Sequence, residues 1–187
     1  MRIFISGGCK NGKSYHAQRL AKAQQTGRGL YYVATMRPID AEDDERIERH
    51  RGERAGFGFT TVEQPRDIND LLIKCDPGGS FLLDSLTALL MNEMFDADGS
   101  VCEGAAEKIT GGLRKVTDRV KDIVIVSDYI YGDAMVYDPA TEKYRKALAE
   151  IDRAAAESCD AVIEASYSNL VVHKGEKAFR ELYEKIL

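Results

Sequence analysis

The chain has 187 residues, of which 44% are hydrophobic and 30% are charged, a composition typical of one globular domain rather than of a disordered segment. Its 31 acidic residues outnumber its 26 basic ones, and the formal net charge of −5 argues against a dedicated nucleic-acid-binding protein. The four cysteines form no C-x-x-C pair, which argues against a zinc site and a disulfide framework. No apolar run approaches the roughly 20 residues that span a bilayer, so we expect a cytoplasmic protein without a membrane span.

Short apolar runs rich in β-branched residues alternate with longer amphipathic segments along the chain. The predicted strands are Arg2–Ser6, Leu30–Thr35, Phe59–Glu63, Phe81–Ser85, Ile123–Ser127 and Ala161–Ala165, with the weaker run Leu170–His173 as a hairpin partner. The predicted helices lie at about 14–26, 41–55, 67–75, 86–95, 103–120, 140–158 and 176–186. This alternation predicts one α/β domain with a mostly parallel sheet that is covered by helices on both faces.

The stretch SGGCKNGKSY contains Gly7-x-x-x-x-Gly12-Lys13-Ser14 between the first predicted strand and the first predicted helix. This spacing and context are typical of a phosphate-binding P-loop, and they predict a P-loop (RecA-like) domain. Glycines let such a loop curl around an anion, and the following helix adds the partial positive charge of its N-terminus. We expect Lys13 to contact the β- and γ-phosphates and Ser14 to bind Mg²⁺. The alternative is a glycine-rich turn without a ligand. The predicted nucleotide contacts in the loop are Gly7, Gly8, Cys9, Lys10, Asn11, Gly12, Lys13 and Ser14.

An acid at the end of a buried strand is the second part that a P-loop site needs. Asp84 ends the run FLLDS, and Asp128 follows the run IVIVS. Both would face the crevice at the carboxyl edge of a parallel sheet, where the loop also lies. Asp84 is preferred as the metal-side acid because three apolar residues precede it, and the alternative for either residue is a strand-end cap.

The predicted helix at 41–55 carries acids at its front and bases at its rear, as a solvated surface helix does. Arg46, His50 and Arg54 are spaced at i, i+4 and i+8, so they share one helical face. The sequence therefore allows two interpretations. One is an ordinary surface helix, and the other is an anion-binding wall in which His50 acts as a nucleophile or general base.

Several motifs follow the P-loop in a distinctive order: a Y-V-A-T strand, an R-I-x-x-H-R helix, a T-V-E strand and the run L-L-D-S-L-T. In this order the sequence resembles the bifunctional adenosylcobinamide kinase/adenosylcobinamide-phosphate guanylyltransferases of cobalamin biosynthesis. The resemblance covers residues 1–175, and 176–187 is expected to be a C-terminal helical extension of the same domain. It implies that His50 is the histidine that becomes guanylylated, and that Asp84 is the metal-side acid. The further nucleotide contacts that it implies are Ala34, Thr35, Met36, Arg51, Gly52, Glu53, Arg54 and Glu63.

The resemblance also implies the substrates and the reactions. The enzyme would use Mg²⁺ with GTP, and also ATP, to phosphorylate adenosylcobinamide, and would then transfer GMP from GTP to adenosylcobinamide phosphate. A homotrimer is implied as well. The chain departs from the family after the fifth strand, where Asp128 and Tyr129 replace an asparagine and a glutamate. Two alternatives stay open: a P-loop small-molecule kinase with one activity, and a non-catalytic GTP- or corrinoid-binding paralogue.

Overall fold

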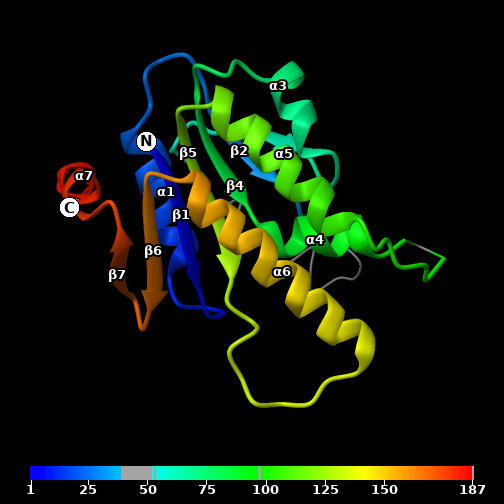
Figure 1. Ribbon diagram of the computed structural model, residues 1–187. Helices are drawn as coiled ribbons and strands as arrows, with labels where there is room; N and C mark the ends of the chain where they lie inside the picture. Colours follow the sequence, from blue (N-terminus) through cyan, green and yellow to red (C-terminus); the bar gives the residue numbers. More distant parts are fainter. Residues whose placement is uncertain (39–51, 53, 97, 187) are drawn as a thin grey trace.

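The computed structural model describes residues 1–38, 52, 54–96 and 98–186, which form one central sheet covered by helices (Figure 1). The strands are β1 (Arg2–Gly7), β2 (Leu30–Ala34), β3 (Thr60–Glu63), β4 (Ser80–Asp84), β5 (Asp122–Asp128), β6 (Ala161–Ser166) and β7 (Asn169–Lys174). The helices are α1 (Lys13–Ala23), the 3₁₀ turn η1 (Ile68–Asp70), α3 (Leu71–Lys74), α4 (Leu86–Met94), α5 (Ala105–Arg119), α6 (Pro139–Ser158) and α7 (Glu176–Tyr183).

The strand order across the sheet is β3-β2-β4-β5-β1-β6-β7. Every neighbouring pair from β3 to β6 is parallel, and β7 alone runs antiparallel, as the hairpin partner of β6. The predicted mostly parallel sheet and the predicted terminal hairpin are therefore confirmed. Because the strands are parallel, the ends of β1, β2, β4 and β5 meet at one edge of the sheet.

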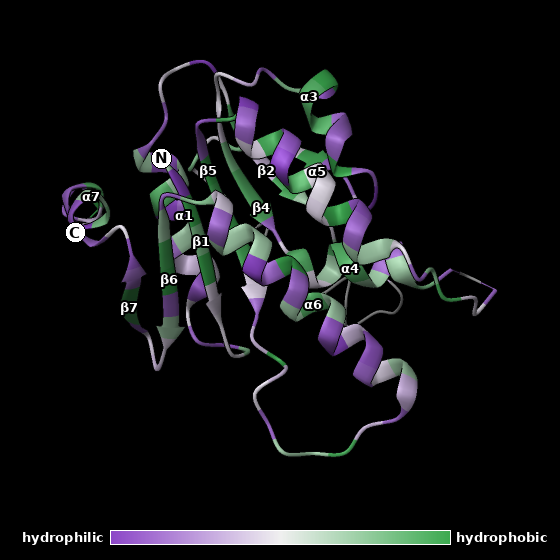
Figure 2. Ribbon diagram, in the orientation of Figure 1, coloured by the Kyte–Doolittle hydropathy of each residue, from purple (hydrophilic) through white to green (hydrophobic). Residues whose placement is uncertain are grey.

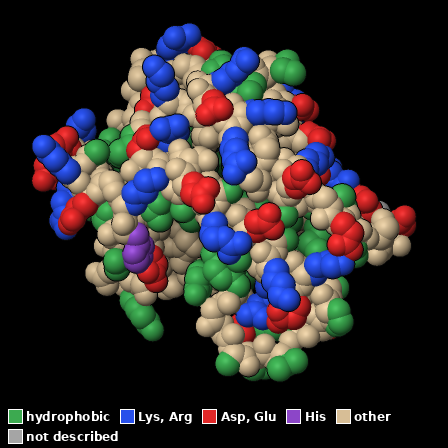
Figure 3. Space-filling model, viewed as in Figure 1, with side chains coloured by type: hydrophobic (Ala, Val, Ile, Leu, Met, Phe, Trp, Pro, Cys, Tyr) green, Lys and Arg blue, Asp and Glu red, His purple; other side chains and the backbone are tan. Residues whose placement is uncertain are grey.

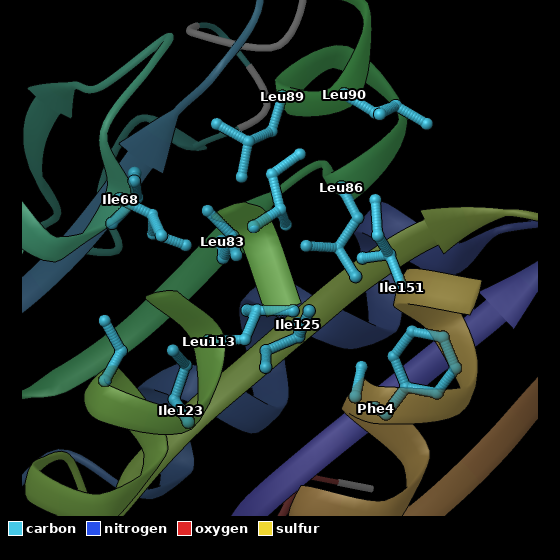
Figure 4. Packing of buried hydrophobic residues seen from close by; sticks show 14 of the residues in the cluster. Phe4, Ile68, Leu83, Leu86, Leu89, Leu90, Leu113, Ile123, Ile125 and Ile151 are labelled. Atoms are coloured by element: carbon cyan, nitrogen blue, oxygen red, sulfur yellow. The ribbon is translucent and has the colours of Figure 1, made fainter. Parts of the chain in front are cut away.

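Helices cover both faces of the sheet, as the sequence predicts. Helices α3, α4, α5 and α6 pack on one face, and α1 and α7 pack on the other. Strand β1 divides its side chains between these two layers, because Phe4 belongs to the first core and Ile3 and Ile5 belong to the second. Figure 4 shows Phe4, Ile125 and Ile151 in the first core. Strands that are buried on both faces appear as green ribbons in Figure 2, which explains their nearly continuous apolar sequences.

The structure divides one of the predicted helices and describes only a small part of another. The segment predicted at 67–75 is divided into the η1 turn and the short helix α3. The helix predicted at 41–55 falls mostly outside the described residues. Elsewhere the element boundaries agree with the prediction to within a few residues. No helix in the described part of the chain is both long and apolar enough to cross a membrane, and Figure 3 shows acidic and basic side chains interspersed over the face that α5 and α6 cover.

Candidate nucleotide site

The loop between β1 and α1 needs its glycines for two different reasons. A Cβ atom on Gly7 would lie 2.2 Å from the backbone oxygen of Ala165, because β1 and β6 approach closely there. Gly12 has a φ of 84°, in the left-handed region that favours glycine. Lys10 also has a positive φ of 59°. The chain therefore turns tightly between the strand and the helix, and α1 begins directly at Lys13.

Lys13 is buried against the loop that precedes it. Its Nζ donates hydrogen bonds to the backbone oxygens of Gly7, at 2.9 Å, and Gly8, at 2.6 Å. The same nitrogen lies 2.8 Å from Oδ1 of Asp128, which ends β5 next to β1. The positive charge of Lys13 is thus balanced by Asp128 inside the protein. The side chain must leave this ion pair in order to contact a bound phosphate.

The two candidate acids occupy neighbouring strand ends. Strand β5 lies between β4 and β1, so Asp128 is closer to the loop than Asp84 in the order of the sheet. The backbone N–H of Asp128 donates to Oγ1 of Thr87 at 2.9 Å. Oδ2 of Asp84 accepts a hydrogen bond from the hydroxyl of Tyr32 at 3.0 Å. The sheet therefore places both carboxyl groups at the edge where the loop lies.

Thr35 fastens the end of β2 to the end of β4. Its hydroxyl accepts from the backbone N–H of Ser85 at 2.7 Å and donates to the backbone oxygen of Ser85 at 2.8 Å. The side-chain amide of Asn92 donates to the backbone oxygen of Thr35 at 2.7 Å. Thr35 is fully buried, whereas its neighbours Ala34 and Met36 are half-buried. These contacts hold the Y-V-A-T segment beside Asp84.

The remaining predicted contacts divide into two groups. Arg54 is 8% exposed, and its guanidinium carbon lies 3.5 Å from the centre of the Tyr32 ring. Arg54 is therefore linked to Asp84 through Tyr32, whose ring lies under the guanidinium and whose hydroxyl donates to Asp84. Gly52 and Glu63 are exposed, and Glu63 ends β3 beside Ala34. The predicted nucleophile His50 lies outside the described residues, as do Arg51 and Glu53.

A cavity of about 550 Å³ opens on the Asp128 side of the sheet edge. Its lining is mostly apolar and comes from α4, from the segment after β5 and from the start of α6. Tyr144 connects the cavity to the strand-end acid, because its hydroxyl donates at 2.8 Å to the backbone oxygen of Thr87, the residue that binds the Asp128 backbone. No periodic signal marks this cavity in the sequence, since its walls come from three separate segments. The lining residues are Met91, Phe95, Ile130, Tyr137, Ala140, Thr141, Tyr144 and Arg145.

A third acid lies buried behind the end of β5, close to Ser127 and Tyr131. Asp152 on α6 is 3% exposed, and its Oδ2 accepts a hydrogen bond from the hydroxyl of Tyr131 at 2.9 Å. Its Oδ1 has no hydrogen-bond partner among the described residues. Burial raises the pKa of Asp152 to about 6, and the nearby hydroxyls of Ser127 and Tyr131 offset only part of that increase.

His16, on the first turns of α1, is buried, and its Nδ1 lies 3.1 Å from the hydroxyl of Tyr183 on α7. Burial lowers the pKa of this imidazole. Its contact joins two helices. Among the described residues, no cluster of three or more His, Cys, Asp or Glu side chains could hold a metal ion.

Comparison with known proteins gives one matching family model, described as cobinamide kinase/cobinamide phosphate guanyltransferase, over residues 3–167. The chain is 29% identical to the bifunctional adenosylcobalamin biosynthesis protein CobP of Pseudomonas aeruginosa, over 87% of this chain and 91% of that protein. It is 33% identical to CobU of Escherichia coli over 53% of each chain. Among solved structures, the flagellar accessory protein FlaH of Methanocaldococcus jannaschii is 16% identical, with a TM-score of 0.48 and coverage of 92% of this chain and 77% of that chain. A KaiC-like protein of Pyrococcus horikoshii is 13% identical, with a TM-score of 0.48 and coverage of 92% and 77%.

Proposed function

This chain belongs to the cobinamide kinase/cobinamide phosphate guanyltransferase family. We propose that it catalyses both the kinase and the guanylyltransferase reaction with nucleotide bound at the single loop between β1 and α1. The observation that carries the proposal is the arrangement at the carboxyl edge of the sheet. There Lys13, at the N-terminus of α1, lies beside Asp128, and Asp84 ends the next strand along the same edge. A positive anion site next to acids is what the transfer of a phosphoryl group from a nucleoside triphosphate requires.

In the kinase reaction, the loop amides and Lys13 bind the β- and γ-phosphates of GTP or ATP. The hydroxyl oxygen of the cobinamide aminopropanol arm attacks the γ-phosphorus, and its proton passes to solvent. The bond between the γ-phosphorus and the bridging oxygen breaks, and the nucleoside diphosphate leaves. Lys13 neutralises the negative charge that develops on these oxygens.

Mg²⁺ fits the oxygen donors at this edge. Ser14 offers a hydroxyl at the start of α1, and Asp84 offers a carboxylate at the end of β4. A hydroxyl and a single carboxylate are hard ligands, and Mg²⁺ commonly completes such a set with phosphate oxygens and water. When bound, the ion would neutralise charge on the phosphates.

In the transferase reaction, a nitrogen of neutral His50 attacks the α-phosphorus of GTP, and the α–β anhydride bond breaks to release pyrophosphate. A phosphate oxygen of adenosylcobinamide phosphate then attacks the same phosphorus. The phosphorus–nitrogen bond breaks, which frees His50 and gives adenosylcobinamide-GDP. Such covalent catalysis divides one difficult displacement into two easier ones. Arg51 and Arg54 would bind phosphate oxygens during these steps.

The corrinoid acceptor would approach from the cavity between α4 and α6. This cavity lies on the Asp128 side of the loop, where the γ-phosphate is expected, and its apolar walls suit the hydrophobic parts of a large macrocycle. Tyr144 and Thr87 separate the cavity from Asp128. We further propose that the protein is a cytoplasmic homotrimer, in keeping with its family.

Incubation with GTP labelled at the α-phosphorus tests the transferase. We expect an acid-labile and base-stable adduct on the wild-type protein, since a phosphoramidate has those stabilities. His50→Ala should abolish the label and leave GTP binding intact, whereas Lys13→Ala should lose both. GTP labelled at the γ-phosphorus and adenosylcobinamide together test the kinase, which should survive His50→Ala.

Persistent labelling of the His50→Ala variant would move the nucleophile to another residue. Phosphorylation of adenosylcobinamide without any enzyme adduct would instead identify a kinase with one activity. GTP binding with neither labelling nor phosphorylation would identify a non-catalytic paralogue.

A further inference from the structure

Hydrogen bonds fix the end of β5 on both sides of Asp128. The backbone N–H of Asp128 donates to Oγ1 of Thr87 on α4 at 2.9 Å. The backbone N–H of the next residue, Tyr129, donates to the backbone oxygen of Gly7 at 2.9 Å. The first bond joins the strand end to α4, and the second joins it to the start of the loop. The backbone of Asp128 is therefore held in place, as a catalytic group must be.

The carboxyl group of Asp128 lies beside the expected position of the γ-phosphate. Its Oδ1 is 2.8 Å from Nζ of Lys13, and this nitrogen is the group that we propose to contact the β- and γ-phosphates. A lysine nitrogen that binds a phosphate lies about 3 Å from the phosphate oxygens. Asp128 and the γ-phosphate are thus neighbours of the same nitrogen. A hydroxyl that attacks the γ-phosphorus can therefore come within hydrogen-bond distance of the carboxylate.

The acceptor is expected to approach Asp128 from the cavity. Tyr144 forms part of the cavity wall, and its hydroxyl donates to the backbone oxygen of Thr87 at 2.8 Å. Thr87 in turn accepts from the backbone of Asp128. The side chain of Asp128 is about one-third exposed. A hydroxyl on a flexible arm of the acceptor can therefore reach Asp128 while the bulk of the acceptor stays in the cavity.

Two other acids near this edge are less suited to meet the acceptor. Asp84 accepts a hydrogen bond from the hydroxyl of Tyr32 and is the carboxylate that we propose for Mg²⁺. Asp152 is 3% exposed, so an acceptor hydroxyl cannot touch it. Asp128 combines an accessible carboxylate with direct contact to Lys13.

We propose that Asp128 is the general base of the kinase reaction. This inference rests on the proposed function, and it identifies the group that takes the proton of the acceptor hydroxyl on its way to solvent. Without nucleotide, Oδ1 of Asp128 is bound to Lys13. When Lys13 leaves this ion pair for the phosphates, that oxygen can accept a hydrogen bond from the acceptor hydroxyl. Nucleotide binding thus frees the base for the reaction.

Atoms and electrons balance in this step. The O–H bond of the acceptor breaks as its oxygen forms the new bond to the γ-phosphorus, and the proton passes to a carboxylate oxygen of Asp128. The bond between the γ-phosphorus and the bridging oxygen breaks, and the nucleoside diphosphate leaves with that electron pair. Asp128 then releases the proton to solvent. An aspartate accepts the proton of the substrate hydroxyl in the same way in protein kinases.

Comparison of the two reactions in the Asp128→Asn variant tests the proposal. Asparagine has nearly the same shape but cannot take the proton, so kcat for phosphorylation of adenosylcobinamide by γ-labelled GTP should fall about 10²- to 10⁴-fold. Guanylylation of the protein by saturating α-labelled GTP involves no acceptor hydroxyl and should keep its wild-type rate. Asp128→Glu keeps a carboxylate and should retain more kinase activity than Asp128→Asn. Asp76→Asn removes an exposed acid that pairs with Arg28 and is the matched control, with kcat unchanged.

A kcat for phosphorylation close to the wild-type value in Asp128→Asn would overturn the general base. Equal loss of phosphorylation and guanylylation, with GTP binding retained, would overturn it too, because Asp128 would then serve the nucleotide or its metal ion in both reactions. Failure of the proposed function looks different: the wild-type protein itself would not phosphorylate adenosylcobinamide.

Discussion

Nζ of Lys13 lies 2.8 Å from Oδ1 of Asp128, so the P-loop lysine of this chain forms an ion pair with the acid that ends the neighbouring strand. The side chain of Lys13 is almost entirely buried, whereas that of Asp128 is about one-third exposed. The pair must break when the lysine turns toward a phosphate. Asp128 therefore competes with the nucleotide for the same positive charge.

Asp128→Asn should relieve this competition, and it introduces the asparagine that the family resemblance implies at this position. We expect affinity for GTP to rise about 3- to 10-fold, the equivalent of about 1 kcal/mol from a partly exposed pair. The free energy of unfolding should fall by a similar amount, because Lys13 loses its counterion. Calorimetry and urea denaturation measure the two effects.

Asp76→Asn is the control for this substitution, because it removes an exposed ion pair with Arg28 far from the loop. It should change neither quantity by a measurable amount. Weaker GTP binding by Asp128→Asn would show instead that Asp128 contacts the nucleotide or its metal ion, in preference to Asp84.

Gly7→Ala should damage both folding and binding. The new Cβ would lie 2.2 Å from the backbone oxygen of Ala165, and neither strand can move without breaking the pairing of β1 with β6. We expect the free energy of unfolding to fall by about 1–3 kcal/mol, as overpacking usually does. Thermal or urea denaturation measures this loss, and GTP affinity should fall as the loop shifts.

Gly111→Ala provides the contrast, because Gly111 lies inside α5 and a Cβ there would meet no atom within 4 Å. Alanine favours helices, so this variant should be more stable than the wild type by about 0.5–1 kcal/mol. Equal effects of the two substitutions would contradict the close approach at Gly7.

The strands and the loop could be predicted from the sequence because local patterns determine them. Runs such as IVIVS are buried on both faces, and the P-loop spacing places two glycines where the backbone needs them. The type of each element follows from such short-range signals. The preference for Asp84 over Asp128 remains a prediction.

The contacts of the candidate site that join residues far apart in the sequence could not be predicted in this way. Lys13 and Asp128 are 115 positions apart, and only the insertion of β5 between β4 and β1 brings them together. The cavity has walls from three segments, and Ser168 lies beside Gly12 only because the β6–β7 hairpin returns to the loop. Each of these depends on strand order, which the residue pattern leaves open.

Ala140→Trp tests whether the cavity between α4 and α6 admits the acceptor. Ala140 lines the cavity from the first turn of α6, so an indole there would fill part of the space. We expect KM for adenosylcobinamide to rise at least about tenfold, the equivalent of about 1.4 kcal/mol of lost binding. GTP binding and guanylylation of the protein should stay unchanged.

Glu150→Trp adds the same indole on an exposed position of α6, away from the cavity, and controls for effects on the helix itself. It should leave KM for the acceptor unchanged. An unchanged KM in Ala140→Trp would place the corrinoid elsewhere on the protein.

Asp152→Asn should stabilise the protein at neutral pH but not at acidic pH. The pKa of Asp152 is raised by burial from 3.8 to about 6, so between these values the folded protein binds a proton that the unfolded chain releases. Stability attributable to this group therefore falls as the pH rises from about 4 to about 6, and the loss is constant above that interval. A shift of about two pKa units corresponds to about 2–3 kcal/mol.

Asparagine avoids the loss because it carries no charge, and its side-chain oxygen can still accept from Tyr131. Urea denaturation at pH 7.5 should show the variant more stable by up to that amount, and at pH 4 the difference should vanish. Asp118→Asn on the exposed side of α5 is the control for the loss of one acidic side chain from the surface. A gain of equal size at both pH values would mean that the asparagine improves packing, and that Asp152 titrates normally in the folded protein.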